Sequence, residues 1–166
     1  ADMLITAWGR THKIPYMILR PTNNYGIGQY VEKLIPKTVK LANLGRKIPL
    51  HNHGQPYRNW LHADDTAEAV LTIIDKGDIG AIYNIAGGFE QSNFDTVRSV
   101  FDSMGIDISD GGKENKHIDY SYSRPGQDVR YSLDDSKLRL LGWSPKKLFN
   151  REIMGIVSYY KDKFIW

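Results

Sequence analysis

Hydrophobic residues recur along this chain at helical and at strand-like spacings, and the spacing predicts the elements. Apolar residues three and four positions apart predict helices over residues 1–12, 31–44, 65–76, 92–104 and 149–164. In the third helix the expected inward stripe is Ala67, Val70, Leu71 and Ile74. Pro36 lies inside the second helix, which is therefore expected to be kinked or to begin later. A short helix is expected to follow Asp134-Asp135-Ser136 and to end near Leu141.

Short apolar runs bounded by glycine, proline or polar clusters predict strands. The run over 16–19 is continuously apolar and closes at Pro21, which is typical of a strand buried on both faces of a parallel sheet. Residues 22–28 and 105–117 are expected to be loops. Because helices and strands alternate, the sequence predicts an α/β fold. Further strands are expected over 48–51 and 57–62, which flank a turn, and over 82–86, 118–123 and 129–133.

The composition is that of an ordinary folded domain. Of 166 residues, 41% are hydrophobic and 25% are charged, so a sizeable core can form without disulfides. Cysteine is absent, which excludes a disulfide scaffold, a cysteine zinc site and a cysteine nucleophile. The net charge of +3 is scattered along the chain, which favours an anionic small ligand over nucleic acid. No apolar run reaches the roughly 18 residues of a membrane span, and the start of the chain has neither a signal-peptide pattern nor a helix cap.

Several candidate motifs are better explained by structure than by chemistry. Gly26-Ile27-Gly28 follows a predicted strand, but Val31 stands where a dinucleotide-binding loop needs its third glycine. His51 and His53 would point to opposite faces of a continuing strand and chelate a metal poorly. Asp64-Asp65 precedes a predicted helix, where carboxylates cap free N–H groups. The sequence therefore predicts no metal site.

Polar and basic residues at three places suit a phosphate-bearing ligand. Asn23 and Asn24 follow the first predicted strand at its carboxyl end, where α/β folds bind ligands. Arg58 lies at the start of a predicted strand, and Arg124 lies in a polar loop. Arginine is suited to phosphate because its guanidinium donates two parallel hydrogen bonds. These residues indicate an anionic ligand wherever the fold brings them together.

Longer runs of the sequence carry a resemblance to a known family. In order, they are Pro21-Thr22-Asn23-Asn24-Tyr25-Gly26, Glu32-Lys33-Leu34-Ile35-Pro36, Ile48-Pro49-Leu50-His51, Arg58-Asn59-Trp60-Leu61-His62-Ala63-Asp64-Asp65, Tyr83-Asn84-Ile85-Ala86-Gly87, Asn93, Arg124-Pro125-Gly126-Gln127-Asp128-Val129-Arg130-Tyr131 and Leu141-Gly142-Trp143-Ser144-Pro145. This series resembles the nucleotide-diphosphate-glucose 4,6-dehydratases, which are extended short-chain dehydrogenases, and it covers nearly the whole chain. The chain departs from the family pattern at Ile27, where proline is usual, at His51, where thymidine-type enzymes have tyrosine, and in the turn Asn52-His53-Gly54.

The resemblance implies a fold and a reaction. The chain is expected to be the carboxyl half of an extended Rossmann-type dehydrogenase. Residues 1–22 would end the NAD-binding domain, and residues 23–166 would form a small mixed α/β nucleotide-sugar-binding domain, with some elements returning to the cofactor domain. The whole enzyme would use NAD to convert dTDP-glucose or UDP-glucose to the 4-keto-6-deoxy sugar, as in rhamnose-type deoxysugar synthesis. The family's acid–base residues lie in the other half, so this chain is expected to hold no catalytic residue and to be inactive alone.

By the same resemblance, this half would hold the substrate and touch one end of the cofactor. Arg58 and Arg124 would clamp the diphosphate, His51 would lie against the base, and Asn24 would lie against the nicotinamide end of NAD. Lys33 and Leu34 would open a helix whose backbone N–H groups face phosphate. The implied substrate-binding residues are Asn23, Lys33, Leu34, Pro49, Leu50, His51, Arg58, Asn93, Arg124, Pro125, Gly126 and Gln127.

Other functions remain open at this point. A related nucleotide-sugar epimerase or decarboxylase would share this half and differ in the catalytic residues of the other half. A non-catalytic nucleotide-sugar-binding module would be the case in which this half is the whole natural protein. The resemblance further implies a homodimer, a nucleotide-diphosphate sugar as partner, no contact with nucleic acid or membrane, and a cytoplasmic location.

Overall fold

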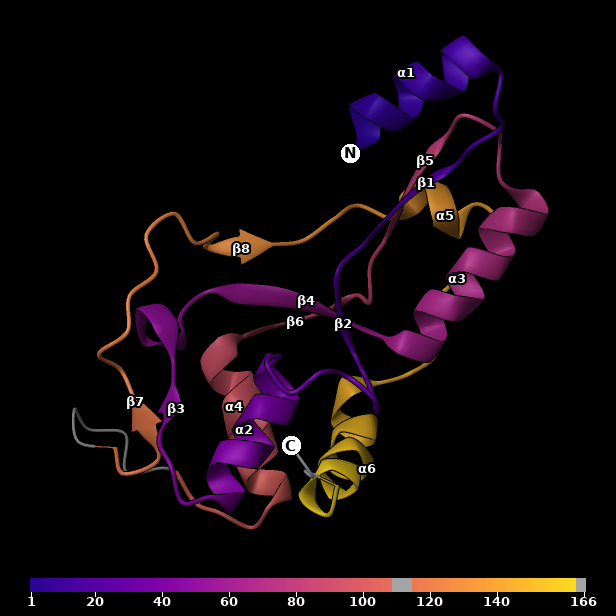
Figure 1. The fold of residues 1–166 in the computed structure, drawn as a ribbon. Helices are drawn as coiled ribbons and strands as arrows, with labels where there is room; N and C mark the ends of the chain where they lie inside the picture. The colour runs from indigo at the N-terminus through magenta and orange to yellow at the C-terminus, as the bar shows by residue number, and fades with distance from the viewer. Residues whose placement is uncertain (109–114, 164–166) are drawn as a thin grey trace.

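The computed structural model describes residues 1–108 and 115–163, and within them helices pack around three small sheets (Figure 1). The helices are α1 (Asp2–His12), α2 (Leu34–Asn43), α3 (Ala63–Lys76), α4 (Asn93–Ser103), α5 (Ser136–Arg139) and α6 (Phe149–Lys161), with a 3-10 turn, η1 (His51–Gly54). The strands are β1 (Ile18–Pro21), β2 (Asn23–Tyr25), β3 (Ile48–Pro49), β4 (Tyr57–His62), β5 (Ile82–Ile85), β6 (Phe89–Ser92), β7 (Ile118–Asp119) and β8 (Arg130–Tyr131).

The elements form two groups that lie at opposite ends of the molecule in Figure 1. At one end β1 and β5 pair in parallel beside α1, α3 and α5. At the other end β2, β4, β6 and β8 form the largest sheet, and β3 pairs with β7 near helices α2, α4 and α6. The α/β class predicted from the alternation of helices and strands is confirmed.

Buried apolar residues of the described part of the chain gather in three clusters. The first joins β2 and β4 to helices α2, α4 and α6, and Tyr25, Trp60 and Phe149 supply its aromatic rings. The second joins β5 and α3 to Leu138 and Trp143. The third lies between β3, β7 and α4. The first and second clusters therefore lie on opposite faces of β4, since Trp60 and Leu61 point to opposite sides of the strand.

Helical periodicity predicted three helices well. Helix α4 begins after Ser92, whose hydroxyl accepts a hydrogen bond from the backbone N–H of Asp95 (3.0 Å). Helix α6 buries the predicted stripe from Phe149 to Tyr160, while Phe164 lies outside the described residues. Helix α2 takes the later of the two predicted starts, which places Pro36 in the first turn, where no intrahelical N–H is needed.

Pairing between distant segments overturned several strand predictions. Residues 22–28 were expected to be a loop, yet β2 lies there and pairs with β4. The turn 52–56 joins no hairpin, because β3 pairs with β7 while β4 belongs to another sheet. Strand β6 was not predicted. The strands β3, β7 and β8 have two residues each, shorter than predicted. Part of the loop expected over 105–117 lies outside the described residues.

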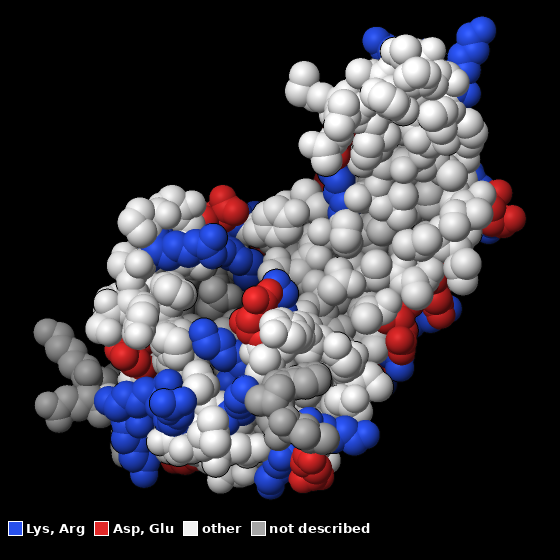
Figure 2. Space-filling view, in the orientation of Figure 1, with Lys and Arg blue, Asp and Glu red and all other residues white. Residues whose placement is uncertain are grey.

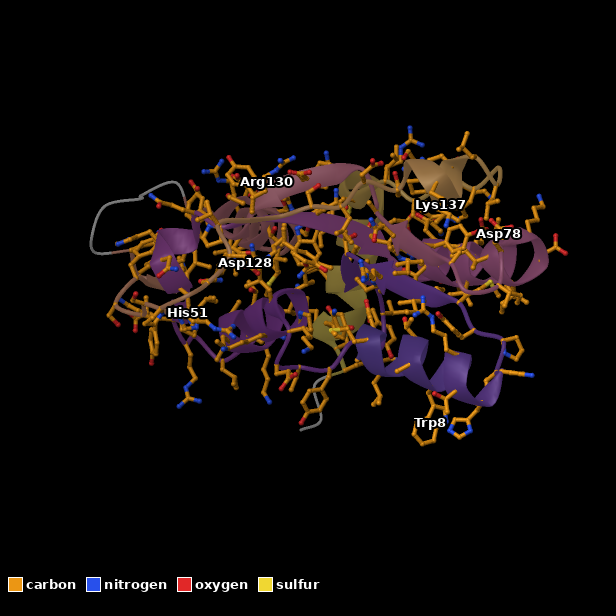
Figure 3. All side chains as sticks on the ribbon, turned by 90° about the horizontal axis from the view of Figure 1, so that it is seen from above. Trp8, His51, Asp78, Asp128, Arg130 and Lys137 are labelled. Atoms are coloured by element: carbon orange, nitrogen blue, oxygen red, sulfur yellow. The ribbon has the colours of Figure 1, made fainter. Side chains whose placement is uncertain are left out.

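Helix α3 exposes apolar residues that were predicted to face inward, and α1 exposes most of its own apolar residues. In α3 the buried positions are Asp65, Ala69 and Ile73, while Leu71 and Ile74 are 67% and 65% exposed. In α1 only Gly9 is buried, and Trp8 projects away from the molecule (Figure 3). Strand β1 is likewise half open, with Ile18 buried and Arg20 exposed. Amphipathic spacing is present in both helices, but no described residue covers Leu71 and Ile74 of α3 or most of the apolar residues of α1.

Candidate functional site

The candidate site lies where strand β4 changes its neighbour. On one edge of β4, Tyr57 and Arg58 pair with β8, and Trp60 to His62 pair with β2. Strands β8 and β2 thus lie end to end along the same edge. Asn23 lies beside Trp60, two positions and about 7 Å along the strand from Arg58.

The adjacent residues Asn23 and Asn24 have different surroundings because consecutive strand residues point to opposite faces. The amide of Asn24 donates to the carbonyl of Thr22 (3.0 Å) and accepts from the hydroxyl of Thr66 (2.6 Å). The side chain of Asn23 has no hydrogen bond to any of the described residues, and it lies on the face that carries Trp60. Asn24 therefore holds β2 against α3, while Asn23 keeps its full hydrogen-bonding capacity.

Arg58 links strand β4 to the loop that carries Arg124. One terminal nitrogen of its guanidinium, Nη1, donates to the carbonyl of Tyr57 (2.7 Å) and to the carbonyl of Asp128 (3.1 Å). A guanidinium has five N–H donors, so three remain without a partner in the described part of the chain. Arg58 is thus fixed in place and still able to form a two-pronged contact with an anion.

The loop between β7 and β8 carries Arg124, Pro125, Gly126 and Gln127. The first three are exposed and Gln127 is half-buried. Gly126 has φ +70°, a left-handed conformation that favours glycine. The guanidinium of Arg124 has no hydrogen bond to a described residue, whereas its backbone is bonded to Asn52 in η1. Sequence reasoning found Arg124 and missed Asn52, whose one signal was the Asn-His-Gly turn that can adopt positive φ.

Residues Pro49, Leu50 and His51 bring β3 to the same end of the molecule. Leu50 is buried, and its N–H donates to the carbonyl of Asp119 (3.0 Å). The His51 ring meets the Tyr122 ring edge-on with centroids 5.7 Å apart. Its Nδ1 is buried without a hydrogen-bond partner among the described residues. His51 and Asp128 lie on the same half of the molecule (Figure 3).

Helices α2 and α4 begin near these strands. Lys33 precedes α2 without a side-chain cap, so the N–H groups of Leu34 and Ile35 remain available, and Lys33 itself pairs with Glu32 (2.8 Å). Leu34 packs against two of the three core clusters. Asn93 opens α4, and its N–H donates to the carbonyl of Pro56 (3.0 Å), which places it beside the start of β4.

The charges around the site are mostly basic. Figure 2 shows Lys and Arg side chains gathered on the half of this face that carries β3, α2 and β8. One acidic group here, Glu90, accepts two hydrogen bonds from Arg130 (2.7 and 2.9 Å) and one from Ser132 (2.6 Å). These bonds, led by that of Arg130, lower the pKa of Glu90 to about 2. The paired Glu90 leaves the field near Arg58 and Arg124 favourable to an anion.

Metal-binding groups and membrane-spanning helices were also sought among the described residues. Within residues 1–108 and 115–163 no group of three acidic, histidine or cysteine side chains could hold a metal ion. Over the same ranges, no helix combines the length and apolar character needed to cross a bilayer. Asp64 and Asp65 do not cap α3 as expected. His62 caps it, accepting from the N–H of Asp64 (3.1 Å), and Asp65 is buried and accepts from the N–H groups of Lys146 and Lys147.

Comparisons with known proteins identify relatives of this chain. The chain is 35% identical over its whole length to dTDP-glucose 4,6-dehydratase 1 of Escherichia coli, covering 46% of that protein. It is 36% identical over 96% of its length to the low-salt glycan biosynthesis protein Agl12 of Haloferax volcanii, covering 49% of it. The dTDP-glucose 4,6-dehydratase DesIV of Streptomyces venezuelae, solved with NAD and TYD bound, superposes with a TM-score of 0.88 at 34% identity, over 97% of this chain and 48% of that one.

The chain spans about half the length of the curated relatives it matches. More distant solved structures share the fold, including UDP-glucose 4-epimerase of Thermotoga maritima, with a TM-score of 0.82 at 22% identity over 96% of this chain and 50% of that one. These relatives confirm the Rossmann-type extended dehydrogenase fold expected from the resemblance. The model of the NAD dependent epimerase/dehydratase family matches residues 1–86. The chain therefore belongs to the NAD dependent epimerase/dehydratase family.

Proposed function

We propose that this chain is the nucleotide-sugar-binding half of an NAD-dependent dTDP-glucose 4,6-dehydratase. The observation that carries the proposal is the convergence of Arg58 and Arg124 on one loop. Arg58 reaches the carbonyl of Asp128, four residues after Arg124, and still has unused donors. Relatives at 35% and 34% identity carry the name dTDP-glucose 4,6-dehydratase, and one of them was solved with NAD and TYD, which supports this substrate class.

In this proposal each residue has a role set by its place. Arg58 and Arg124 donate to the diphosphate, where hydrogen bonds to charged groups are strong. The N–H groups at the start of α2, after Lys33, face the same anion, and the positive end of the helix favours it. Asn23 donates its unpaired amide to the diphosphate. The half-buried ring of His51 and the adjoining Pro49 and Leu50 form the wall against the base.

The remaining proposed contacts complete the nucleotide pocket. Asn93, beside the start of β4, reaches the ribose hydroxyls. Pro125, Gly126 and Gln127 lie over the nucleotide, and the positive φ of Gly126 lets the backbone turn there. Tyr122 stands edge-on to His51 and closes the base wall from the same loop.

Only one residue of this chain is proposed to contact NAD. The amide of Asn24 has two N–H groups, of which one is bonded to Thr22, so its donor set fits a single contact with the nicotinamide end. When bound, NAD supplies the oxidation and the later reduction of the sugar. The proposed part of this chain is to orient the nucleotide sugar and to hold it during that chemistry. The isolated chain is accordingly expected to give no 4-keto product.

Titration calorimetry tests the binding role. The chain is titrated with dTDP and with UDP, as wild type and as Arg58→Ala and Arg124→Ala. Each hydrogen bond to a charged phosphate contributes about 1.5–3 kcal/mol, so each variant is expected to bind roughly ten- to a hundredfold more weakly. Arg98→Ala is the matched control, because Arg98 lies over the Phe94 ring on α4 and has no part in the site. Unchanged affinity in both site variants would refute the clamp.

A mass measurement of the product tests the reaction class in the complete protein. A dehydratase gives a nucleotide sugar lighter by one water, whereas an epimerase gives a product of unchanged mass. We expect loss of water from dTDP-glucose or UDP-glucose in the presence of NAD. A product of unchanged mass would assign the chain to the epimerase branch of its family.

We also propose that the complete enzyme is a cytoplasmic homodimer. The exposed apolar residues of α1 support burial of this face in the complete enzyme, and they line a cavity of about 400 Å³ with Ile14 and Tyr16. Isolated proteins seldom expose an apolar patch of this kind unless it is an interaction surface. Sedimentation equilibrium of the complete enzyme should give twice the protomer mass, and a monomer would contradict the proposal.

A further inference from the structure

We propose that Asn52 is a positioning residue that holds the Arg124–Gln127 loop in its ligand-ready arrangement before the ligand arrives. This inference rests on the proposed function, since it assigns a role at the proposed diphosphate site. Asn52 lies in η1, between His51 and His53, and it does not itself reach into the proposed diphosphate contacts. Its effect on the ligand is therefore exerted through Arg124 and Gln127.

The side chain of Asn52 forms hydrogen bonds to three residues of this loop, Ser123, Arg124 and Gln127. Its Nδ2 donates to Oε1 of Gln127 (3.1 Å) and, at longer range, to the carbonyl of Arg124 (3.5 Å). Its Oδ1 accepts from the hydroxyl of Ser123 (3.2 Å) and from the N–H of Arg124 (3.3 Å). The backbone of Asn52 adds a bond from its N–H to the carbonyl of Tyr122 (3.2 Å). The side-chain amide therefore spans the loop from Ser123 to Gln127, and the backbone N–H of the same residue extends the attachment to Tyr122.

The partners also fix which way the amide points. The backbone N–H of Arg124 can only donate, so it requires the oxygen of Asn52, and the carbonyl of Arg124 can only accept, so it requires the nitrogen. The single arrangement that meets both demands also satisfies Ser123 and Gln127. An aspartate at this position would offer acceptors and no donor, so the carbonyl of Arg124 would lose its bond from this side chain and Gln127 would have to turn its amide to donate instead of accept.

The backbone at Asn52 explains why asparagine serves here. Its φ of 49° and ψ of 43° lie in the left-handed region, which asparagine and glycine tolerate better than other residues. Glycine could adopt the same backbone but would lack the amide. The conformation and the hydrogen bonds together make Asn52 a residue that both shapes η1 and ties a second loop to it.

The loop has few other ties. The loop leaves β7 at Asp119. Apart from the bonds of Asn52, the next hydrogen bonds that it receives from outside lie near β8, where Arg58 donates to the carbonyl of Asp128 and the N–H of Tyr57 donates to the carbonyl of Val129 (2.8 Å). Between these ends, residues 121–126 are exposed. In the described part of the chain, Asn52 is thus the side chain that hydrogen-bonds to the middle of the loop, beside the ring contact of His51 with Tyr122. Without it, ligand binding would have to order the loop, which costs affinity.

The variant Asn52→Gly isolates the side chain, because glycine retains the left-handed backbone. We expect its affinity for dTDP and UDP to fall about tenfold by titration calorimetry, with an unfolding midpoint close to that of the wild type. His53→Gly is the matched control: His53 has the same left-handed backbone (φ 54°) in the same turn, and its ring stacks on Tyr120 next to β7, without a hydrogen bond to the Arg124–Gln127 segment in the described part of the chain. The control is expected to bind as the wild type does.

A double-mutant cycle separates positioning from a merely structural effect. If Asn52 acts in part through Arg124, Asn52→Gly should weaken binding less in the Arg124→Ala variant than it does in the wild type. Losses that add in full would overturn the proposal. Amide hydrogen exchange provides a readout that needs no ligand, because the N–H of Arg124 is bonded to Asn52. Its exchange should accelerate in Asn52→Gly and stay unchanged in His53→Gly.

The two proposals fail differently. If the wild type binds and Arg124→Ala weakens binding while Asn52→Gly alters neither affinity nor exchange, the positioning role is overturned and the proposed function stands. If the wild type binds neither dTDP nor UDP, the proposed function is overturned, and faster exchange at Arg124 in Asn52→Gly still supports the tether.

Discussion

Replacing Asp65 by asparagine should destabilise the chain more than the same substitution at its exposed neighbour, Asp64. Asp65 is 2% exposed, and its two carboxylate oxygens accept from the backbone N–H groups of Lys146 and Lys147, both at 3.0 Å. The carbonyl of the same residue accepts from the indole N–H of Trp143 (3.2 Å). One residue at the start of α3 thus anchors the segment that leads into α6.

The magnitude follows from what asparagine cannot do. Its amide retains one acceptor oxygen, so one of the two backbone N–H groups would face an NH2 group instead of an oxygen. A hydrogen bond to a charged group is worth about 1.5–3 kcal/mol, and a buried donor left without a partner costs about 1–3 kcal/mol. We expect Asp65→Asn to lower the free energy of unfolding by about 2–4 kcal/mol. In a chain of this size this lowers the melting temperature by roughly 4–16 °C.

Urea unfolding followed by tryptophan fluorescence measures the change. Asp64→Asn is the control, because the Asp64 side chain is 67% exposed and pairs only loosely with Lys147 (3.8 Å). An exposed ion pair contributes about 0–1 kcal/mol, so the control should move the midpoint little. Equal effects of the two substitutions would refute the argument that the paired backbone bonds of Asp65 anchor this segment.

Three further predictions follow from single contacts. Gly87→Ala should strongly destabilise the chain in thermal unfolding, because an added Cβ would lie 1.8 Å from the carbonyl oxygen of Trp60; a melting temperature within a degree of wild type would contradict this. Glu90→Gln should destabilise the chain at pH 7, and the difference in stability from wild type should shrink as the pH falls from about 5 to 2. The reason is that the lowered pKa of Glu90 reflects bonds that stabilise the fold only while the carboxylate is charged. A constant difference between the urea midpoints across this pH range would argue against the prediction. Thr66→Val should cost about 1 kcal/mol through loss of the bond to Asn24 while leaving dTDP affinity unchanged, and weaker binding would show that Asn24 contributes to the substrate site.

Local sequence signals predicted the helices, whereas several strands that depend on pairing with a distant segment were predicted incorrectly. The stripe of α4 and its Ser92 cap are encoded within one segment, so spacing alone located them. Strand β2 is three residues long and includes two asparagines, and it exists because Trp60 and its neighbours lie alongside. No window of sequence contains both partners. The same reason hides β6, which forms against the opposite edge of β4.

The candidate site shows the same division. Arg58 and Arg124 could be singled out because the guanidinium chemistry is carried by the residue type itself. Asn52 could not, because its importance depends on a left-handed backbone and on a loop about seventy residues further along the chain. The predicted stripe of α3 was wrong for a related reason. Leu71 and Ile74 are spaced for burial, but Asp65 and the segment it binds determine which face of the helix turns inward.

The thin attachment of α1 has a consequence for how the chain comes apart. Gly9, which lies against the Tyr16 ring, is the one buried residue of this helix, and an ion pair between Asp2 and Arg20 secures its other end. Segments with so little buried apolar surface open at a small fraction of the global unfolding free energy. A protease that cuts after basic residues should therefore cleave at Arg10 or Lys13 while the sheet around β4 is still intact. The chain should behave as two cooperative units of unequal strength, and the weaker one should be the first to be trimmed.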